Sequence, residues 1–274
     1  MMYRDYYRLQ DEPFNITPDP RYLYMTAQHQ EAMNHLLYGI RNRKGFICLT
    51  GEVGAGKTTL CRSLLNELGD DYHTALILNP MLTETQLLRA IVEEFGIHTK
   101  RKDRLGYLRL LNQFLLRINS VGGDAVLIID EAQDMTVSAL EMVRLLSNLE
   151  TERQKLLQIL LVGQPELRTT LNNPALRQLT QRITVRYHLK NMNQEETAEY
   201  LRHRLKIAGQ DDRDQNAVRF DYGAVREIYR YSHGTPRLVN AIGDKALLAG
   251  YVYRTATIDR GIVITALSDL KEAG

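Results

Sequence analysis

Gly51-Glu52-Val53-Gly54-Ala55-Gly56-Lys57-Thr58 matches the pattern GxxxxGK[ST] at every fixed position. An apolar run at residues 46–50 precedes it, and a helix-like segment at residues 59–65 follows it. This is the order of strand, loop and helix that a phosphate-binding loop requires. The sequence therefore predicts a nucleotide site here, and the alternative is a glycine-rich turn that holds no ligand.

Each residue type in this loop suits phosphate binding. Glycines let backbone N–H groups turn inward around the phosphates, and the N-terminus of the following helix adds partial positive charge. Lys57 is predicted to reach the β- and γ-phosphates of ATP and the Thr58 hydroxyl to ligate Mg²⁺, with Thr59 as a weaker addition. The predicted nucleotide-binding residues of the loop are Gly51, Glu52, Val53, Gly54, Ala55, Gly56, Lys57, Thr58 and Thr59.

Composition limits the class of protein. The chain has 274 residues, enough for one medium α/β domain and a smaller partner. Its two cysteines, Cys48 and Cys61, show no metal-ligand spacing, which argues against a disulfide scaffold or a zinc site and suits a reducing cytoplasm. No apolar stretch approaches the roughly 20 residues that a transmembrane helix needs. We therefore expect a soluble, cytoplasmic protein.

Charge leaves the partner of the chain open. The 35 basic and 33 acidic side chains nearly cancel, so no global field favours nucleic acid or a membrane surface. Three short basic clusters are interpreted as solvated surface, with phosphate contact as the alternative. These clusters are residues 41–44, 100–102 and 202–204.

Five short apolar runs alternate with helical patterns. Their continuous apolarity is typical of strands covered on both faces, as in a parallel sheet. Thr83 and Gln86 form a predicted capping box for one of the intervening helices. The pattern predicts a doubly wound α/β domain, a parallel sheet flanked by helices. The five runs are residues 46–50, 74–78, 125–130, 157–162 and 183–188.

Two further segments flank this domain. The N-terminal residues carry several prolines and tyrosines, which predict an extended arm that wraps the domain rather than a regular element. Beyond residue 190 the strand signal fades, and Asn193 and Asp221 are predicted to cap helices. The predicted divisions are an arm at 1–27, a P-loop α/β domain at 28–190 and an all-helical domain at 191–274.

The apolar run at residues 125–130 ends in two adjacent carboxylates, Asp130 and Glu131. This is the Walker B signature that accompanies a phosphate-binding loop. Asp130 is predicted to hold Mg²⁺ together with Thr58, and Glu131 to polarise the attacking water as a general base. The alternative is a pair of acids at a strand end, which the P-loop upstream makes the weaker interpretation.

A polar residue also follows the run at residues 157–162. In open α/β sheets the carboxyl ends of the strands face the ligand, so Gln164 is predicted to sense the γ-phosphate. The alternative is an amide that hydrogen-bonds a turn.

Together these motifs resemble those of AAA+ ATPases of the ExeA/GspA type, the general secretion pathway protein A family. Besides the Walker pair, the resemblance rests on DEAQ at residues 130–133, GQPEL at 163–167, LRQLTQRI at 176–183 and GTPR at 234–237. The segment PFNITPDP at residues 13–20 is similar too. The resemblance spans almost the whole chain and implies a P-loop AAA+ fold with a helical lid. It also implies that the chain binds ATP and Mg²⁺ and forms a homo-oligomer, a ring such as a hexamer or a filament.

The resemblance assigns roles to further residues. It places Gln164 at the sensor 1 position and Arg237 at the sensor 2 position in the lid. Arg182 is the implied arginine finger, presented to the neighbouring subunit's nucleotide, and Arg177 is the competing candidate. Both arginines could instead form interface salt bridges. The implied catalytic residues are Lys57, Glu131, Gln164, Arg182 and Arg237, and Asp130 and Arg237 join the nucleotide-binding set.

Two points remain open at this level. Adenine contacts in similar ATPases come from the segment before the P-loop and from the lid, so Phe14, Ile16 and Leu238 are candidates, with core packing as the alternative. Full-length relatives carry a membrane span and a peptidoglycan-binding region after the ATPase part, and this sequence stops at Gly274 without either. The chain is interpreted as a fragment of such a protein or as a free-standing relative of the MshM type, the soluble branch of pilus biogenesis.

Three functions follow as hypotheses. The resemblance favours a cytoplasmic ATPase, recruited to the inner membrane by a partner, that couples ATP hydrolysis to assembly of a bacterial secretion or pilus machine. The alternative is an ATP-dependent, DNA-binding regulator of transposition similar to TnsC, TniB or MuB, which the near-neutral charge disfavours modestly. A nucleotide-dependent scaffold with little turnover is the third, and Glu131 argues against it. The expected partners are other copies of the chain and a membrane-associated assembly protein, with nucleic acid under the alternative and no direct membrane insertion.

Overall fold

The computed structural model describes residues 2–15, 20–100, 103–151, 154–211 and 217–272. Its internal contacts divide the chain into two units. The sheet unit comprises Ala27–Glu52 and Leu60–Leu189, and the helical unit comprises Met1–Thr26, Val53–Thr59 and Lys190–Gly274. Most of the predicted P-loop therefore groups with the helical unit, although it continues directly from a strand of the sheet.

The sheet unit is built on a parallel sheet of five strands in the order β2-β3-β4-β1-β5. Each strand overlaps one of the five apolar runs. Strands β1, β3 and β4 are buried almost throughout, which needs apolar residues at successive positions, while the edge strands β2 and β5 are only partly buried. The strands are β1 Phe46–Gly51, β2 Tyr72–Ile77, β3 Asp124–Ile129, β4 Leu157–Gly163 and β5 Ile183–Leu189. The predicted P-loop AAA+ sheet is confirmed.

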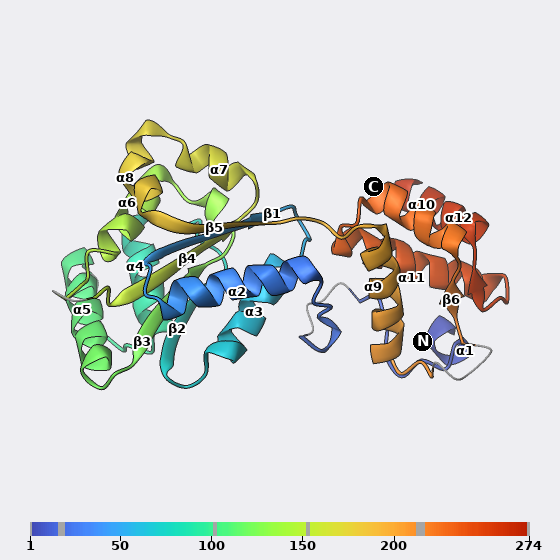
Figure 1. Ribbon diagram of the computed structural model, residues 1–274, viewed down its shortest axis with the longest axis horizontal. Helices are drawn as coiled ribbons and strands as arrows, with labels where there is room; N and C mark the ends of the chain where they lie inside the picture. Colours follow the sequence, from blue (N-terminus) through green and yellow to red (C-terminus); the bar gives the residue numbers. More distant parts are fainter. Residues whose placement is uncertain (1, 16–19, 101–102, 152–153, 212–216, 273–274) are drawn as a thin grey trace. The chain divides into compact units, whose positions relative to one another are not determined.

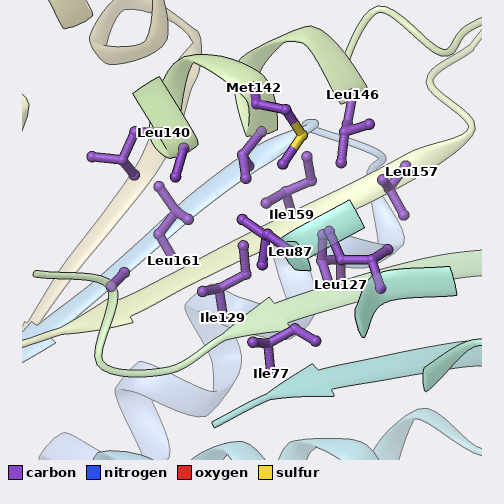
Figure 2. Packing of buried hydrophobic residues seen from close by; sticks show 14 of the residues in the cluster. Ile77, Leu87, Leu127, Ile129, Leu140, Met142, Leu146, Leu157, Ile159 and Leu161 are labelled. Carbon is purple, nitrogen blue, oxygen red and sulfur yellow. The ribbon is translucent and has the colours of Figure 1, made fainter. Parts of the chain in front are cut away.

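Helices cover both faces of this sheet, as Figure 1 shows. Helices α2 and α3 lie over one face, where a Cβ on Gly39 of α2 would stand 2.6 Å from Ile47 Cδ1 of β1. Helices α4, α5 and α6 pack on the other face, where Leu87, Leu127 and Met142 belong to one hydrophobic core (Figure 2). The helices of this unit are α2 Ala27–Arg41, α3 Lys57–Leu68, α4 Glu84–Glu94, α5 Arg104–Ser120, α6 Val137–Leu146, α7 Glu166–Leu171 and α8 Arg177–Arg182, with 3₁₀ turns η2 Ala132–Asp134 and η3 Pro174–Leu176.

Two helices of the helical unit begin at the predicted caps. Asn193 Oδ1 accepts a hydrogen bond from Glu196 N at 2.8 Å, and Asp221 Oδ1 accepts one from Ala224 N at 2.7 Å. The unit is not all-helical, because β6 and β7 form a short parallel pair, too brief for strand periodicity to register in the sequence. Its elements are α9 Gln194–Ile207, β6 Arg219–Phe220, α10 Tyr222–Ser232, α11 Pro236–Val252, β7 Thr257–Ile258 and α12 Arg260–Glu272.

The N-terminal segment packs into the core of the helical unit. It contains a short helix, α1 Met2–Tyr6, and a 3₁₀ turn, η1 Pro20–Tyr22, where an arm without regular elements was expected. The Tyr3 hydroxyl donates to Asp244 Oδ1 at 2.5 Å, and the Tyr7 hydroxyl donates to Leu247 O at 3.2 Å. These partners lie near the other end of the chain, so no local pattern displays the pairing. Residues 16–19 of the expected arm lie outside the described residues.

Arg204 of α9 holds this N-terminal segment in place. Its residue surface is 6% exposed, and its guanidinium carbon lies 4.3 Å from the centroid of the Tyr22 ring. Its Nε donates to Pro13 O, and its Nη2 donates to Asn15 O at 2.9 Å. The basic cluster at residues 202–204 is therefore only partly a solvated surface. The cluster at 100–102 includes residues 101 and 102, which lie outside the described residues.

Replacing Arg204 by Ala is expected to lower the free energy of unfolding by about 2–4 kcal/mol, because two backbone carbonyl oxygens lose their charged donor. Urea unfolding measures the change. Arg202→Ala is the matched control, since the neighbouring Arg202 is exposed, and a change within about 0.5 kcal/mol is expected. Equal losses in the two variants would contradict this role for Arg204.

Candidate nucleotide-binding and catalytic site

The P-loop has the backbone that phosphate binding requires. Gly54 and Gly56 have φ angles of +77° and +95°, a region that L side chains rarely adopt, which is why these positions need glycine. Helix α3 begins at Lys57, and the first turn of a helix offers N–H donors and partial positive charge to an anion. Lys57 is only 6% exposed. A cation buried beside a helix N-terminus fits a polyphosphate ligand.

The loop leaves the sheet at Gly51, the last residue of β1. Gly51 pairs with Leu189 of β5, and a Cβ on Gly51 would stand 2.7 Å from Leu189 O, so only glycine fits this turn. Of the remaining predicted loop residues, Ala55 is buried and Glu52 and Val53 are exposed, while Thr58 and Thr59 are half-buried.

Within the helical unit, the GTPR segment lies against the P-loop. A Cβ on Gly54 would stand 2.6 Å from Arg237 Cβ and 3.4 Å from Thr235 Cγ2. Thr235 precedes α11 as its N-cap residue, and its Oγ1 accepts a hydrogen bond from Asn191 Nδ2 at 3.0 Å. The predicted sensor 2 residue Arg237 is thus brought to the loop that it is expected to serve.

Asp130 is buried at the carboxyl end of β3. It is 2% exposed, its backbone N–H donates to Ile77 O at 2.8 Å, and its Oδ1 accepts a hydrogen bond from Glu131 N at 2.9 Å. A buried carboxylate must be compensated by donors or a cation, and carboxylate oxygen is a preferred ligand of Mg²⁺. The chemistry of Asp130 and of the Thr58 hydroxyl fits the predicted Mg²⁺ role.

Glu131 and Gln164 meet at the edge where neighbouring strands β3 and β4 end. Gln164 Nε2 donates to Glu131 Oε2 at 3.2 Å. The side-chain amide of Gln164 thus bonds the Walker B glutamate, and this contact favours the sensor interpretation over an amide that caps a turn. The backbone of Glu131 is left-handed, with φ 49° and ψ 38°, a conformation that costs a non-glycine residue about 1 kcal/mol and that clusters at functional sites.

Gln133 joins this pair, although no role for it was predicted from the sequence. Its Nε2 donates to Glu131 Oε2 at 2.7 Å, and its Oε1 accepts a hydrogen bond from the backbone N–H of Gln164 at 2.9 Å. The string DEAQ, which carries Gln133, was the only sequence signal for it. The two-residue spacing between Glu131 and Gln133 does not show that the Gln133 amide reaches Gln164, at the end of another strand.

The two candidate finger arginines differ in their surroundings. Arg182, the last residue of α8, is half-buried, and its Nη1 donates to Ser147 Oγ at 2.6 Å and to Asn148 Oδ1 at 2.7 Å. Arg177, the first residue of α8, is exposed. Arg182 is therefore oriented by residues that follow α6, while Arg177 stands on the surface of the sheet unit.

The adenine candidates fare differently. Phe14 is 1% exposed, its ring lies 5.9 Å from that of Phe220, and it contacts Gly243, so it is a core residue of the helical unit and the base-platform interpretation is wrong. Leu238 on α11 is 40% exposed and remains available. Ile16 lies outside the described residues.

Comparison with known proteins identifies an AAA domain and a homologue that matches the whole chain. A family model described as an AAA domain matches residues 40–171. General secretion pathway protein A of Aeromonas hydrophila is 43% identical over 279 residues, covering 100% of this chain and 50% of that protein. The chain spans about half the length of the curated relative that it matches. Among the described residues, no helix combines the length and apolarity needed to cross a bilayer.

Solved structures share the fold. The ORC2 protein of Aeropyrum pernix, in ADPNP and ADP complexes, has a TM-score of 0.67 and 17% identity, covering 94% of this chain and 71% of that chain. The RuvB branch migration motor of Thermotoga maritima has a TM-score of 0.56 and 20% identity, covering 88% of this chain and 69% of that chain. At these identities the similarity establishes the AAA+ architecture alone.

Proposed function

This chain is an AAA-domain protein homologous along its whole length to general secretion pathway protein A, and from that premise we propose that it is an ATPase whose turnover drives assembly of a secretion or pilus machine in the bacterial envelope. One observation carries the enzymatic part. Glu131, a carboxylate able to activate water, is bonded to the amide of Gln164 at the carboxyl edge of the sheet from which the P-loop departs.

In the proposed reaction, Lys57 neutralises oxygens of the β- and γ-phosphates of ATP. Thr58 and Asp130 would hold Mg²⁺, which would supply further positive charge to the phosphates. A carboxylate oxygen of Glu131 accepts a proton from water while the water oxygen attacks the γ-phosphorus. The bond from that phosphorus to the bridging oxygen of the β-phosphate breaks, ADP and inorganic phosphate leave, and Glu131 returns its proton to solvent.

Two arginines complete the proposed site. Arg237 of the helical unit contacts the γ-phosphate in this proposal. The close approach of Gly54 to Arg237 supports this role. Arg182 acts across a ring of identical subunits, where a guanidinium stabilises the charge of the transition state on the neighbouring nucleotide. The hydrogen bonds from Arg182 to Ser147 and Asn148 support a fixed orientation for this side chain.

The assembly role is proposed from the relative. The 43% identical relative is named for a general secretion pathway. We infer that this chain works on the cytoplasmic side of the inner membrane and is recruited there by a membrane-associated assembly protein.

The proposal predicts that the purified chain hydrolyses ATP and assembles into larger particles in a nucleotide-dependent, DNA-independent manner. Phosphate release and sedimentation, each with and without duplex DNA at low and moderate salt, measure both properties. Hydrolysis and assembly that duplex DNA stimulates, with strong salt dependence, would contradict the envelope role and favour a transposition regulator.

A mixture of subunits tests the arginine finger. Mixing Arg182→Ala with Glu131→Gln subunits should restore some turnover, because a site that keeps Glu131 can then receive Arg182 from its neighbour. Restoration with Arg177→Ala but not with Arg182→Ala would move the finger role to Arg177.

A further inference from the structure

Gln133 lies in η2, and its side-chain amide is hydrogen-bonded at both ends. Its Nε2 donates to Glu131 Oε2 at 2.7 Å, and its Oε1 accepts the backbone N–H of Gln164 at 2.9 Å. The side chain of Gln164 donates to the same Oε2 at 3.2 Å. These three bonds close a ring that ties the Walker B glutamate to the end of strand β4.

The end of β4 is shaped to admit this amide. A Cβ on Gly163 would stand 2.8 Å from Gln133 Oε1 and 2.9 Å from Leu167 Cδ2. Gly163 does not need glycine for its own backbone, since its φ is not in the left-handed region. Because Gly163 has no side chain, Gln133 Oε1 has room beside it to accept the hydrogen bond from Gln164 N. The placement of Gln133 therefore rests on the shape of a second strand as well as on its own hydrogen bonds.

The ring orients the carboxylate of Glu131. Oε2 accepts both side-chain N–H donors, while Oε1 accepts no hydrogen bond from any residue that the structure describes. Two donors on one oxygen restrict rotation of the carboxylate, which a single donor would allow. Oε1 is then the oxygen left to accept a proton from water.

We propose that Gln133 is a positioning residue for ATP hydrolysis, which fixes Glu131 so that Oε1 faces the attacking water. The inference rests on the proposed ATPase function. Gln133 acts through Glu131 and Gln164 and not on the nucleotide, so its loss should reduce kcat and leave ATP affinity intact.

The first test uses Gln133→Ala in the full chain. Its kcat is expected to fall by about 10- to 100-fold, as when a supporting partner of a site residue is removed, with KM for ATP within about two-fold of the wild-type value. Gln30→Ala is the matched control, because Gln30 is an exposed glutamine on α2. It is expected to keep the wild-type kcat.

The second test uses Gln133→Glu, which keeps an acceptor oxygen for the backbone N–H of Gln164 but loses the N–H donor to Glu131 Oε2. Its kcat is expected to fall at least as far as that of Gln133→Ala, with KM for ATP within about two-fold of the wild-type value. A wild-type kcat in Gln133→Glu would contradict the role of this donor, and a rise in KM in place of a fall in kcat would indicate a merely structural role.

The third test is a double-mutant cycle with Gly163→Ala. The added methyl group would stand 2.8 Å from Gln133 Oε1, which is too close for the oxygen to keep its place. Gly163→Ala alone should therefore reduce kcat, and in the Gln133→Ala background it should add little. If the losses of kcat in the two single variants add up in the double variant, the effect of Gly163→Ala comes from its contact with Leu167, and the proposal is overturned. An unchanged or higher kcat in Gln133→Ala would also overturn it, while the proposed function would stand as long as the wild-type chain hydrolyses ATP. Absence of turnover in the wild type would overturn both.

Discussion

Glu131→Gln is expected to lower kcat for ATP hydrolysis by about 100- to 10,000-fold, the range for loss of a general base. The amide has the shape of the carboxylate, and its oxygen still accepts the N–H donors of Gln133 and Gln164, so the local structure should persist. The amide cannot take a proton from water. ATP binding should persist because Lys57 and Asp130 are unchanged.

Phosphate release at saturating ATP measures kcat, and titration with a fluorescent ATP analogue measures affinity. Glu166→Gln is a suitable control, since Glu166 is an exposed acid at the start of α7. Unchanged hydrolysis in Glu131→Gln would refute Glu131 as the base. A wild-type chain that binds ATP with negligible turnover would support a nucleotide-dependent scaffold instead.

Lys57→Ala is expected to weaken ATP binding by about 10- to 100-fold, which corresponds to the roughly 1.5–3 kcal/mol of a charge-assisted hydrogen bond. The ammonium group is nearly buried at the first residue of α3, so its contact with phosphate would be little screened by water. No other lysine belongs to the loop, so no neighbouring ammonium group in it replaces the lost charge. Nucleotide-dependent assembly should be lost together with binding.

Equilibrium titration with the ATP analogue and sedimentation with ATP test this expectation. Lys44→Ala is the control, because Lys44 is exposed and lies just before β1, outside the loop. Wild-type affinity in Lys57→Ala would remove the loop as the phosphate site. The two substitutions should have different effects, since Glu131→Gln is expected to bind ATP without turnover, whereas Lys57→Ala is expected to bind ATP only weakly.

Much of the sheet unit was predictable because its signals are local. Each of the five strands overlaps a predicted apolar run, and the central strands β1, β3 and β4, which are buried almost throughout, require such runs. The capping box at Thr83 and the helix cap at Asn193 are formed as predicted, because a cap involves residues three positions apart. The P-loop could be identified for the same reason, since its glycines and Lys57 act through a short stretch of backbone.

The helical unit was predicted less well because its contacts are distant in sequence. Tyr3 and Tyr7 look like part of a polar, aromatic arm, yet their hydroxyls bond Asp244 and Leu247. Arg204 sits in a basic cluster, yet it is buried against Tyr22. Side-chain type shows what a residue can bond but not which partner the fold brings to it.

The candidate site shows the same difference between local signals and distant contacts. The identities of Lys57, Asp130 and Glu131, and the sheet that carries the Walker acids, follow from motif and periodicity, which act over a few residues. The orientation of Glu131 does not, because it depends on Gln133 reaching across to Gln164 on another strand, into the space left by Gly163. Long-range packing alone brings those atoms within hydrogen-bonding distance, so that part of the site appears only once the chain is folded.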